Sequence, residues 1–142
     1  MKMKYLATLL LTLALGCTAA FADEDDTPLA KEMKTMNKSL RALKKQVADT
    51  AKKDDCLALI ATIRKSLDAS VKLEPAKTKE VPAAEKAAYL DKYKAQLTDL
   101  AKTYDELEAA IKADKAEDVK KALDKLSDQK EKGHKDFAPD EK

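Results

Sequence analysis

The chain has 142 residues, a length that suits one domain. Charged residues make up 38% and aromatic residues 4%, there is no tryptophan, and only two residues are glycine, so the composition favours helices over a β-sheet. The formal net charge is +2 and no long block of one sign stands out, which argues against a surface for nucleic acid or for an anionic membrane.

Residues 1–22 predict a cleaved signal peptide. "MKMK" is a positive start, "YLATLLLTLALG" is an apolar run too short to span a bilayer as a helix, and an A-x-A-type cleavage signal ends at Ala22. Its removal takes two of the 28 basic residues, so the mature protein, residues 23–142, has 26 of each charge. The alternative is a lipoprotein anchored through Cys17, but Ala14 stands where the usual bacterial pattern has a leucine.

A first helix is predicted from Thr27 onward. Thr27 suits the N-cap position and Pro28 suits the first helical position. Apolar residues then recur at spacings of three and four, which is typical of one buried helix face. This seam consists of Leu29, Met33, Met36, Leu40, Leu43 and Val47.

The motif "KKDD" interrupts the seam, and Asp54 or Asp55 is predicted to cap a second helix. The inward stripe of this helix is predicted to be Cys56, Ile60, Ile63, Leu67 and Val71. Pro75 ends the helix, and "EPAKTKEVP" predicts a loop. Cys56 is the one cysteine left after cleavage; a small, partly buried residue is the simpler interpretation, and an intermolecular disulfide is the alternative.

A third helix is predicted to start near Pro82, with an apolar seam of Leu90, Tyr93, Leu97, Leu100, Tyr104, Leu107 and Ile111. Asp114 followed by Glu117 resembles a capping box that opens a fourth helix. The stripe of that helix is Val119, Leu123, Leu126, Lys130, His134 and Phe137. Four amphipathic helices with short connections predict an all-α fold, an antiparallel up-down-up-down four-helix bundle.

His134 is the only histidine, and it lies on the fourth stripe. In an up-down bundle the start of the first helix and the end of the fourth lie at the same end, so Met33 and His134 fall at similar depth. A thioether and an imidazole facing each other are the axial pair of a six-coordinate haem iron, in which the thioether raises the reduction potential. The alternatives are core packing for Met33 and a surface position for His134, favoured by the helix dipole.

The stretch "EMKTMNKSLRALKK" strongly resembles the first helix of cytochrome b562, and "KADKAEDVKKALDKLSDQKEKGHKDF" resembles the fourth helix of that family. The similarity extends over essentially the whole mature chain, although the second helix and the loop after it match only weakly. This resemblance places the two iron ligands of the family at Met33 and His134. It implies a periplasmic four-helix bundle that holds one haem b and transfers electrons.

The resemblance also implies the walls of the haem site. It selects Met33 rather than Met36 as the ligand and packs Met36 beneath the ring. Tyr93 and Leu97 would be haem neighbours on the third helix, where the family tends to have aromatic residues, and Leu97 departs from that pattern. The family often has an arginine at the position of Lys130, which could extend toward a haem propionate as a point charge.

Haem would be held without a covalent bond. Related c-type cytochromes attach haem through C-x-x-C-H, but here the five residues ending in the histidine are "KEKGH", with Lys130 and Gly133 in place of the cysteines. Glycine inside a helix costs about 1 kcal/mol relative to alanine, so Gly133 indicates either a close approach of the porphyrin or an early end of the helix. Cys56 falls at the far end of the bundle from His134, and we predict that it does not ligate iron.

The predicted function is therefore a soluble periplasmic haem b electron-transfer protein. The alternative is a haem-free structural or binding bundle of the same family. An enzyme is not expected, because the chain has no second histidine, no Ser-His-Asp or Cys-His arrangement and no glycine-rich phosphate loop. We expect a monomer that meets an unidentified redox partner weakly and briefly, with no nucleic-acid partner and no membrane partner after the signal peptide is removed.

Overall fold

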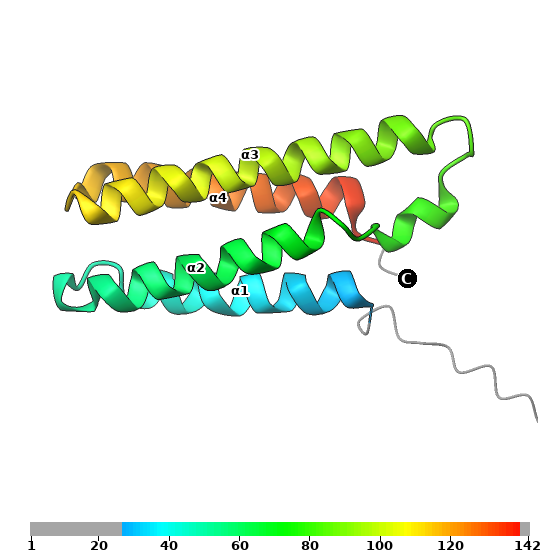
Figure 1. The fold of residues 1–142 in the computed structure, drawn as a ribbon. Helices are drawn as coiled ribbons and strands as arrows, with labels where there is room; N and C mark the ends of the chain where they lie inside the picture. Colours follow the sequence, from blue (N-terminus) through cyan, green and yellow to red (C-terminus); the bar gives the residue numbers. More distant parts are fainter. Residues whose placement is uncertain (1–26, 140–142) are drawn as a thin grey trace, which may run out of the picture.

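The computed structural model describes residues 27–139, and the predicted signal peptide, its cleavage site and Cys17 lie outside that range. The elements are α1 (Pro28–Gln46), η2 (Thr50–Lys52), α2 (Lys53–Ser70), η3 (Ala76–Glu80), α3 (Lys86–Lys112) and α4 (Ala116–Phe137). The described range contains four α-helices, two short 3-10 helices (η2 and η3) and no strand. The helices run alternately up and down (Figure 1), so the predicted all-α four-helix bundle is confirmed.

The four helices form two hairpins. α1 packs against α2 and α3 packs against α4, and the hairpins are joined mainly where α2 packs against α3. The first and last helices, α1 and α4, are not among the closely packed pairs. Figure 1 shows that the start of α1, the end of α4 and η3 lie at one end of the bundle.

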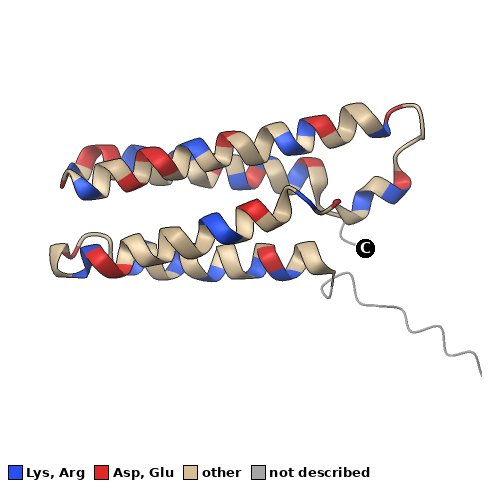
Figure 2. Cartoon of the chain, in the orientation of Figure 1, with Lys and Arg blue, Asp and Glu red and all other residues tan. Residues whose placement is uncertain are grey.

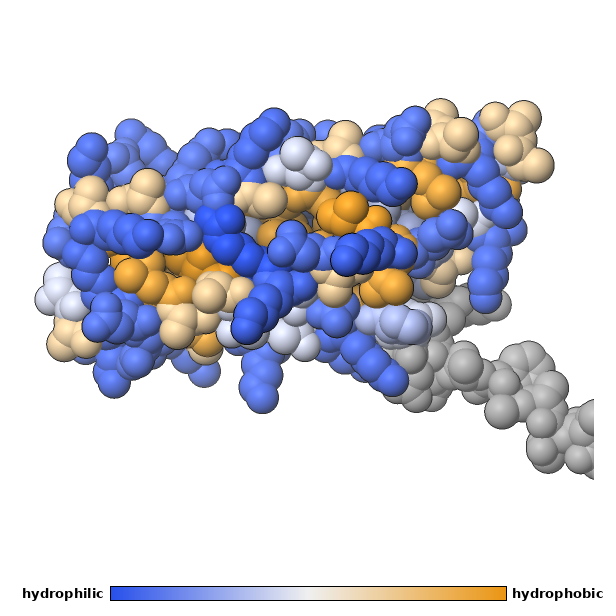
Figure 3. All heavy atoms as spheres, viewed as in Figure 1, coloured by the Kyte–Doolittle hydropathy of each residue, from blue (hydrophilic) through white to orange (hydrophobic). Residues whose placement is uncertain are grey.

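Each helix contributes to one apolar core. The largest fully buried apolar side chains are Leu43 from α1, Ile60 and Ile63 from α2, Leu107 from α3 and Leu126 from α4. Burying a side chain of this size stabilises the fold by about 1.5–3 kcal/mol. Charged residues recur along all four helices (Figure 2). On the face shown in Figure 3, hydrophobic residues reach the surface mainly in a band between the two hairpins. No helix in the described range is long and apolar enough to cross a membrane.

The predicted start of α1 is confirmed, whereas the predicted start of α2 is wrong. Thr27 Oγ1 accepts a hydrogen bond of 3.1 Å from the Ala30 N–H. Asp54 and Asp55 do not cap α2 but lie inside its first turn, and the N-cap residue is Lys52. The helix begins two or three residues earlier than predicted because η2 leads directly into it.

The predicted capping box at the start of α4 is also wrong, because Asp114 ends α3 instead. Asp114 has a φ of 55°, the left-handed conformation. The Lys115 N–H donates to the Ala110 carbonyl at 3.0 Å and the Asp114 N–H donates to the Ile111 carbonyl at 3.2 Å, which together form a Schellman motif. The Asp114 carboxylate accepts from Lys53 Nζ at 2.9 Å, so its charge is used across the bundle rather than at the N-terminus of α4.

The connection between α2 and α3 differs from the prediction in three ways. α2 ends at Ser70, so Val71, which was predicted to end the inward stripe, lies beyond the helix and is 39% exposed. The predicted loop contains η3. α3 begins at Lys86 rather than near Pro82, because a turn closed by a hydrogen bond of 2.9 Å from the Glu85 N–H to the Pro82 carbonyl precedes it.

Candidate cofactor site

A cavity of about 680 Å³ lies at the end of the bundle where α1 begins and α4 ends. Residues of α1, α3 and α4 line it, together with Pro75 and Ala76 from the connection before α3. The cavity exists because α1 and α4 do not pack closely against each other. Its volume lies within the roughly 300–1,000 Å³ usual for small-molecule and cofactor sites.

Met33 and His134 both line this cavity, from α1 and α4 respectively. The proximity inferred from the chain order is therefore present: Met33 is near the start of α1, and His134 is three residues before the end of α4. Met33 is half-buried and His134 is exposed. The thioether and the imidazole thus border the same space from two helices.

The predicted inward stripe of α4 is wrong for two of its members. Lys130 and His134 are exposed, although both line the cavity. Leu126 and Phe137, on either side of them, are buried. The stripe is exposed here because α1 does not pack closely against the last turns of α4.

The other predicted neighbours of the cofactor line the same cavity. Met36 from α1 is 6% exposed, and Tyr93 and Leu97 from α3 are 3% and 6% exposed, so these three form an inner apolar wall. Lys130 lies at the rim, where its ammonium group reaches solvent. The cavity therefore combines an apolar interior with a cation at its edge.

Three aromatic rings pack together at the end of the cavity, and two of them, Tyr93 and Phe137, line it. Tyr89 and Tyr93 each pack edge-on against Phe137, with ring centroids 5.2 and 5.3 Å apart. The Tyr93 hydroxyl donates a hydrogen bond of 3.0 Å to the carbonyl of Ser70, the last residue of α2. Burial, and to a smaller extent Tyr89, raises the pKa of Tyr93, so its hydroxyl remains a donor.

Polar residues that the sequence interpretation missed hold the last turn of α4. Gln96 Nε2 on α3 donates to Asp136 Oδ2 at 2.7 Å, and Lys92 Nζ lies 3.1 Å from the same oxygen. The hydrogen bonds from Lys92 and then Gln96 lower the pKa of Asp136 below its ordinary value. Because Asp136 is two residues from His134, these contacts fix the helix segment that carries the imidazole.

Gln129 is another missed residue on the cavity wall. Its Oε1 is buried and has no hydrogen-bond partner among the described residues. Its position three residues after Leu126 was a usable signal, because residues at that spacing share a helix face.

Gly133 lies within α4, which continues to Phe137, so the explanation by an early helix end is wrong. A Cβ at this position would meet Gln96 Oε1 at 3.6 Å, an ordinary contact. Gly133 also lines the cavity. Neighbouring side chains of the described structure therefore do not by themselves require a glycine here.

The side chains of the cavity that could ligate a metal fit haem better than they fit a metal ion held by several protein ligands. No group of three or more His, Cys, Asp or Glu residues that could hold a metal ion occurs within residues 27–139. Cys56 is 1% exposed in the core and does not line the cavity. One imidazole and one thioether on an apolar cavity match the axial pair of a haem that supplies its other four iron ligands itself.

A protein-family model described as cytochrome b562 matches residues 28–138. The match spans all four helices and includes the whole cavity lining apart from Thr27 and Pro139. Neither a curated protein nor a solved structure gives a match.

Proposed function

Because the chain belongs to the cytochrome b562 family, we propose that it is a periplasmic electron-transfer protein that holds one haem b between Met33 and His134. The observation that carries this proposal is that both side chains line one cavity of suitable size. In the proposal, residues 1–22 are removed and residues 23–142 form the mature monomer.

The haem would supply one-electron chemistry, and the surrounding residues would hold it and set its potential. Met33 and His134 would fill both axial positions and leave none for a substrate, which favours electron exchange over catalysis. The thioether of Met33 would favour ferrous iron and so raise the reduction potential of a bound haem.

The remaining residues would bind and shield the cofactor. Met36, Tyr93 and Leu97 would exclude water from the ring, and Lys130 would lie near a haem carboxylate as a point charge. With Lys130 and Gly133 in place of cysteines, only ligation and packing would retain the haem.

Titration of the purified mature protein with haemin tests the proposal. We expect one equivalent to bind and, on reduction, to give the sharp α and Soret bands of a low-spin ferrous haem. The exposed position of His134 is the feature that favours a haem-free bundle, and a folded protein that ignores added haemin would support that alternative.

The ligand assignment is tested by replacing Met33. We expect Met33→Ala to bind haem in a high-spin form with a lower potential, because a soft axial donor is lost. The matched variant Met36→Leu alters the neighbouring cavity wall and should keep the low-spin spectrum. Unaltered spectra in Met33→Ala combined with a high-spin Met36→Leu would instead assign the ligand to Met36.

A further inference from the structure

The excess positive charge of the described chain is concentrated in α1. Of the 28 basic and 26 acidic residues of the sequence, 25 and 20 lie between residues 27 and 139. α1 has six basic residues and one acidic residue, Glu32, so the rest of the described chain has 19 of each. The near-balance of charge over the whole sequence hides this asymmetry.

Five of the six basic residues form one continuous stripe along α1. Their spacings of three, four, three and four place them on one helix face. The basic stripe consists of Lys31, Lys34, Lys38, Arg41 and Lys45, and all five are exposed. At 1.5 Å per residue it is about 21 Å long.

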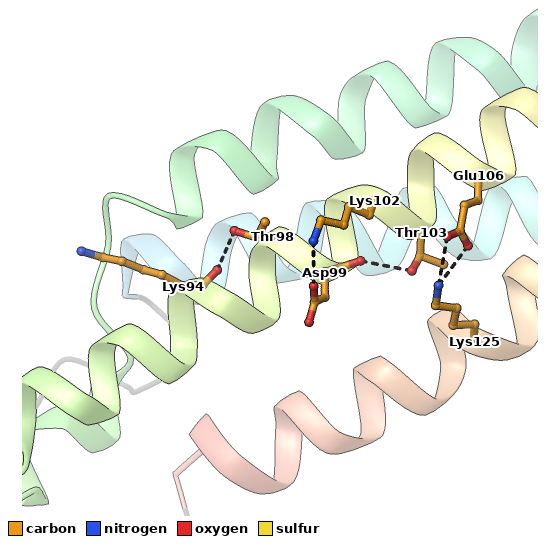
Figure 4. Close-up of polar contacts among 7 residues, drawn as sticks. All are labelled: Lys94, Thr98, Asp99, Lys102, Thr103, Glu106 and Lys125. Atoms are coloured by element: carbon orange, nitrogen blue, oxygen red, sulfur yellow. Dashed lines mark hydrogen bonds and ion pairs between the residues drawn. The ribbon is translucent and has the colours of Figure 1, made fainter.

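The basic stripe differs from the charged faces of the other helices. There, cations alternate with acidic residues and several are paired, as Lys125 is with Glu106 at 3.0 Å and Lys102 is with Asp99 at 3.3 Å (Figure 4). By contrast, the side chains of Lys38, Arg41 and Lys45 make no ion pair with any residue between 27 and 139. Like charges at these spacings repel one another, so the stripe is not explained by the stability of the fold.

One member of the stripe borders the cavity. Lys34 belongs to the stripe and also lines the cavity, and it is adjacent in sequence to Met33. A molecule lying along α1 would therefore be close to the proposed iron ligand. This proximity connects the charge on α1 with electron exchange.

Resting on the proposed function, we infer that the redox partner is a protein with an acidic surface and that it docks along the basic stripe of α1. Charge complementarity of this kind accelerates encounter and sets orientation more than it raises affinity. The stripe is one helix wide and the remaining surface is balanced, so it suits a local acidic patch better than a broad polyanion such as a membrane or nucleic acid.

Arg41 and Lys45, at the far end of the stripe, are exposed. They are therefore accessible to the acidic surface of a second molecule.

Stopped-flow kinetics with reduced plant-type ferredoxin, an acidic one-electron donor, test the inference. The haem-loaded wild type is compared with the triple variant Lys38→Glu, Arg41→Glu and Lys45→Glu, none of which lines the cavity. We expect the second-order rate constant to fall with ionic strength in the wild type and to be at least tenfold lower in the variant at low salt. Reduction by the small cation hexaammineruthenium(II) should not become slower in the variant.

The matched control makes the same charge change on the other three helices. It combines Lys65→Glu on α2, Lys94→Glu on α3 and Lys120→Glu on α4, all at exposed positions. Equal losses in the two triple variants would overturn the docking site, because net charge alone would then explain the effect. Wild-type rate constants in the α1 triple variant would also overturn the docking site. The same holds if the only change in that variant is that it no longer sediments with phosphatidylglycerol vesicles.

The absorption spectrum distinguishes a failure of the docking site from a failure of the proposed haem-binding function. A low-spin spectrum with a rate that is indifferent to the α1 charges would overturn the docking site alone. A protein that takes up no haemin would overturn the proposed function and the docking role with it.

Discussion

Tyr89 and Tyr93 pack against the same aromatic ring, but their hydroxyl groups differ in hydrogen bonding. The Tyr93 hydroxyl donates to the Ser70 carbonyl, whereas the buried Tyr89 hydroxyl has no hydrogen-bond partner in the described range. Both rings pack edge-on against Phe137. Removing each hydroxyl therefore separates hydrogen bonding from ring packing.

We predict that Tyr93→Phe destabilises the protein by about 1 kcal/mol, because a buried hydrogen bond is lost. Tyr89→Phe should be neutral or slightly stabilising, because it removes a buried hydroxyl that is not satisfied. Urea unfolding of both variants checks this. Equal losses in the two variants would show that the Tyr93–Ser70 hydrogen bond adds no stability.

Chain order and helical spacing predicted that Met33 and His134 lie at one end of the bundle, and the resemblance to the family added the other four predicted site residues. Met33, Met36, Tyr93, Leu97, Lys130 and His134 all line the same cavity. The exposure of Lys130 and His134 could not be predicted, since it depends on how far apart α1 and α4 lie. Gln96 and Asp136 were missed because their bond joins two helices.

At the scale of the element, the end of α3 offers a test of backbone strain. Asp114 adopts the left-handed conformation, which costs most L-residues about 1–2 kcal/mol and glycine nearly nothing. Its ion pair with Lys53 is partly exposed and is worth at most about 1 kcal/mol.

We predict that Asp114→Gly changes the free energy of unfolding by less than about 0.5 kcal/mol, because relief of strain offsets the lost ion pair. Asp114→Ala loses the ion pair and keeps the strain, so it should destabilise by up to about 1 kcal/mol. Chemical denaturation of both variants gives the comparison. If alanine is tolerated as well as glycine, the left-handed conformation is not what limits this position.

Ion pairs between α2 and α3 predict that the stability of the fold depends on pH. Glu108 lies 2.5 Å from Lys112 Nζ and 3.0 Å from Arg64 Nη2, and Arg64 also pairs with Asp105. The hydrogen bond from Lys112, supported by the charges of Lys112 and Arg64 against a desolvation cost, lowers the pKa of Glu108 below 4.5. A lowered pKa in the folded state adds stability above the pKa of the unfolded chain, and that stability is lost as the pH falls through the folded value.

We therefore predict that the wild type loses stability as the pH falls below about 4.5, and that Glu108→Gln has a shallower loss in that range. At pH 7 the variant should be less stable by about 1 kcal/mol. Unfolding curves between pH 7 and pH 3 test this, with Glu74→Gln in the exposed connection after α2 as the control. A Glu108→Gln slope that matches the wild type would exclude Glu108 as a source of the acid sensitivity.

The helices themselves could be predicted because each seam of three-and-four spacing is long and is interrupted clearly. The ends of the helices were predicted less accurately, because they depend on contacts between residues that are far apart in the sequence. Asp114 bonds Lys53, 61 positions earlier, so its role at the end of α3 is not visible in the motif around it. Val71 fits the spacing of the second stripe but lies one residue past the end of α2.

At the scale of the whole molecule, the loose contact between α1 and α4 predicts how the cofactor affects stability. The two hairpins pack mainly through α2 and α3, so the cavity lies where the bundle is least closed. A ligand that binds only the folded state stabilises it by mass action, by about 2.7 kcal/mol at one hundred times its Kd.

We predict that saturating haemin raises the thermal midpoint and slows amide hydrogen exchange most at the start of α1 and the end of α4. Protection of α2 should change least, since it contributes no residue to the cavity. Calorimetry and hydrogen exchange with and without haemin provide the measurements. Uniform protection across the four helices would mean that haemin acts on global unfolding alone.

The two side chains assigned to the iron come from opposite ends of the chain, in the first turns of α1 and the last turn of α4. A fragment that stops anywhere before His134 can contain all the core residues of the first three helices and still lack the imidazole. In the proposed site, the red colour of the ferrous protein would then appear only in chains that extend past His134. Pigmentation would serve as a built-in check that synthesis had reached the last turn of α4.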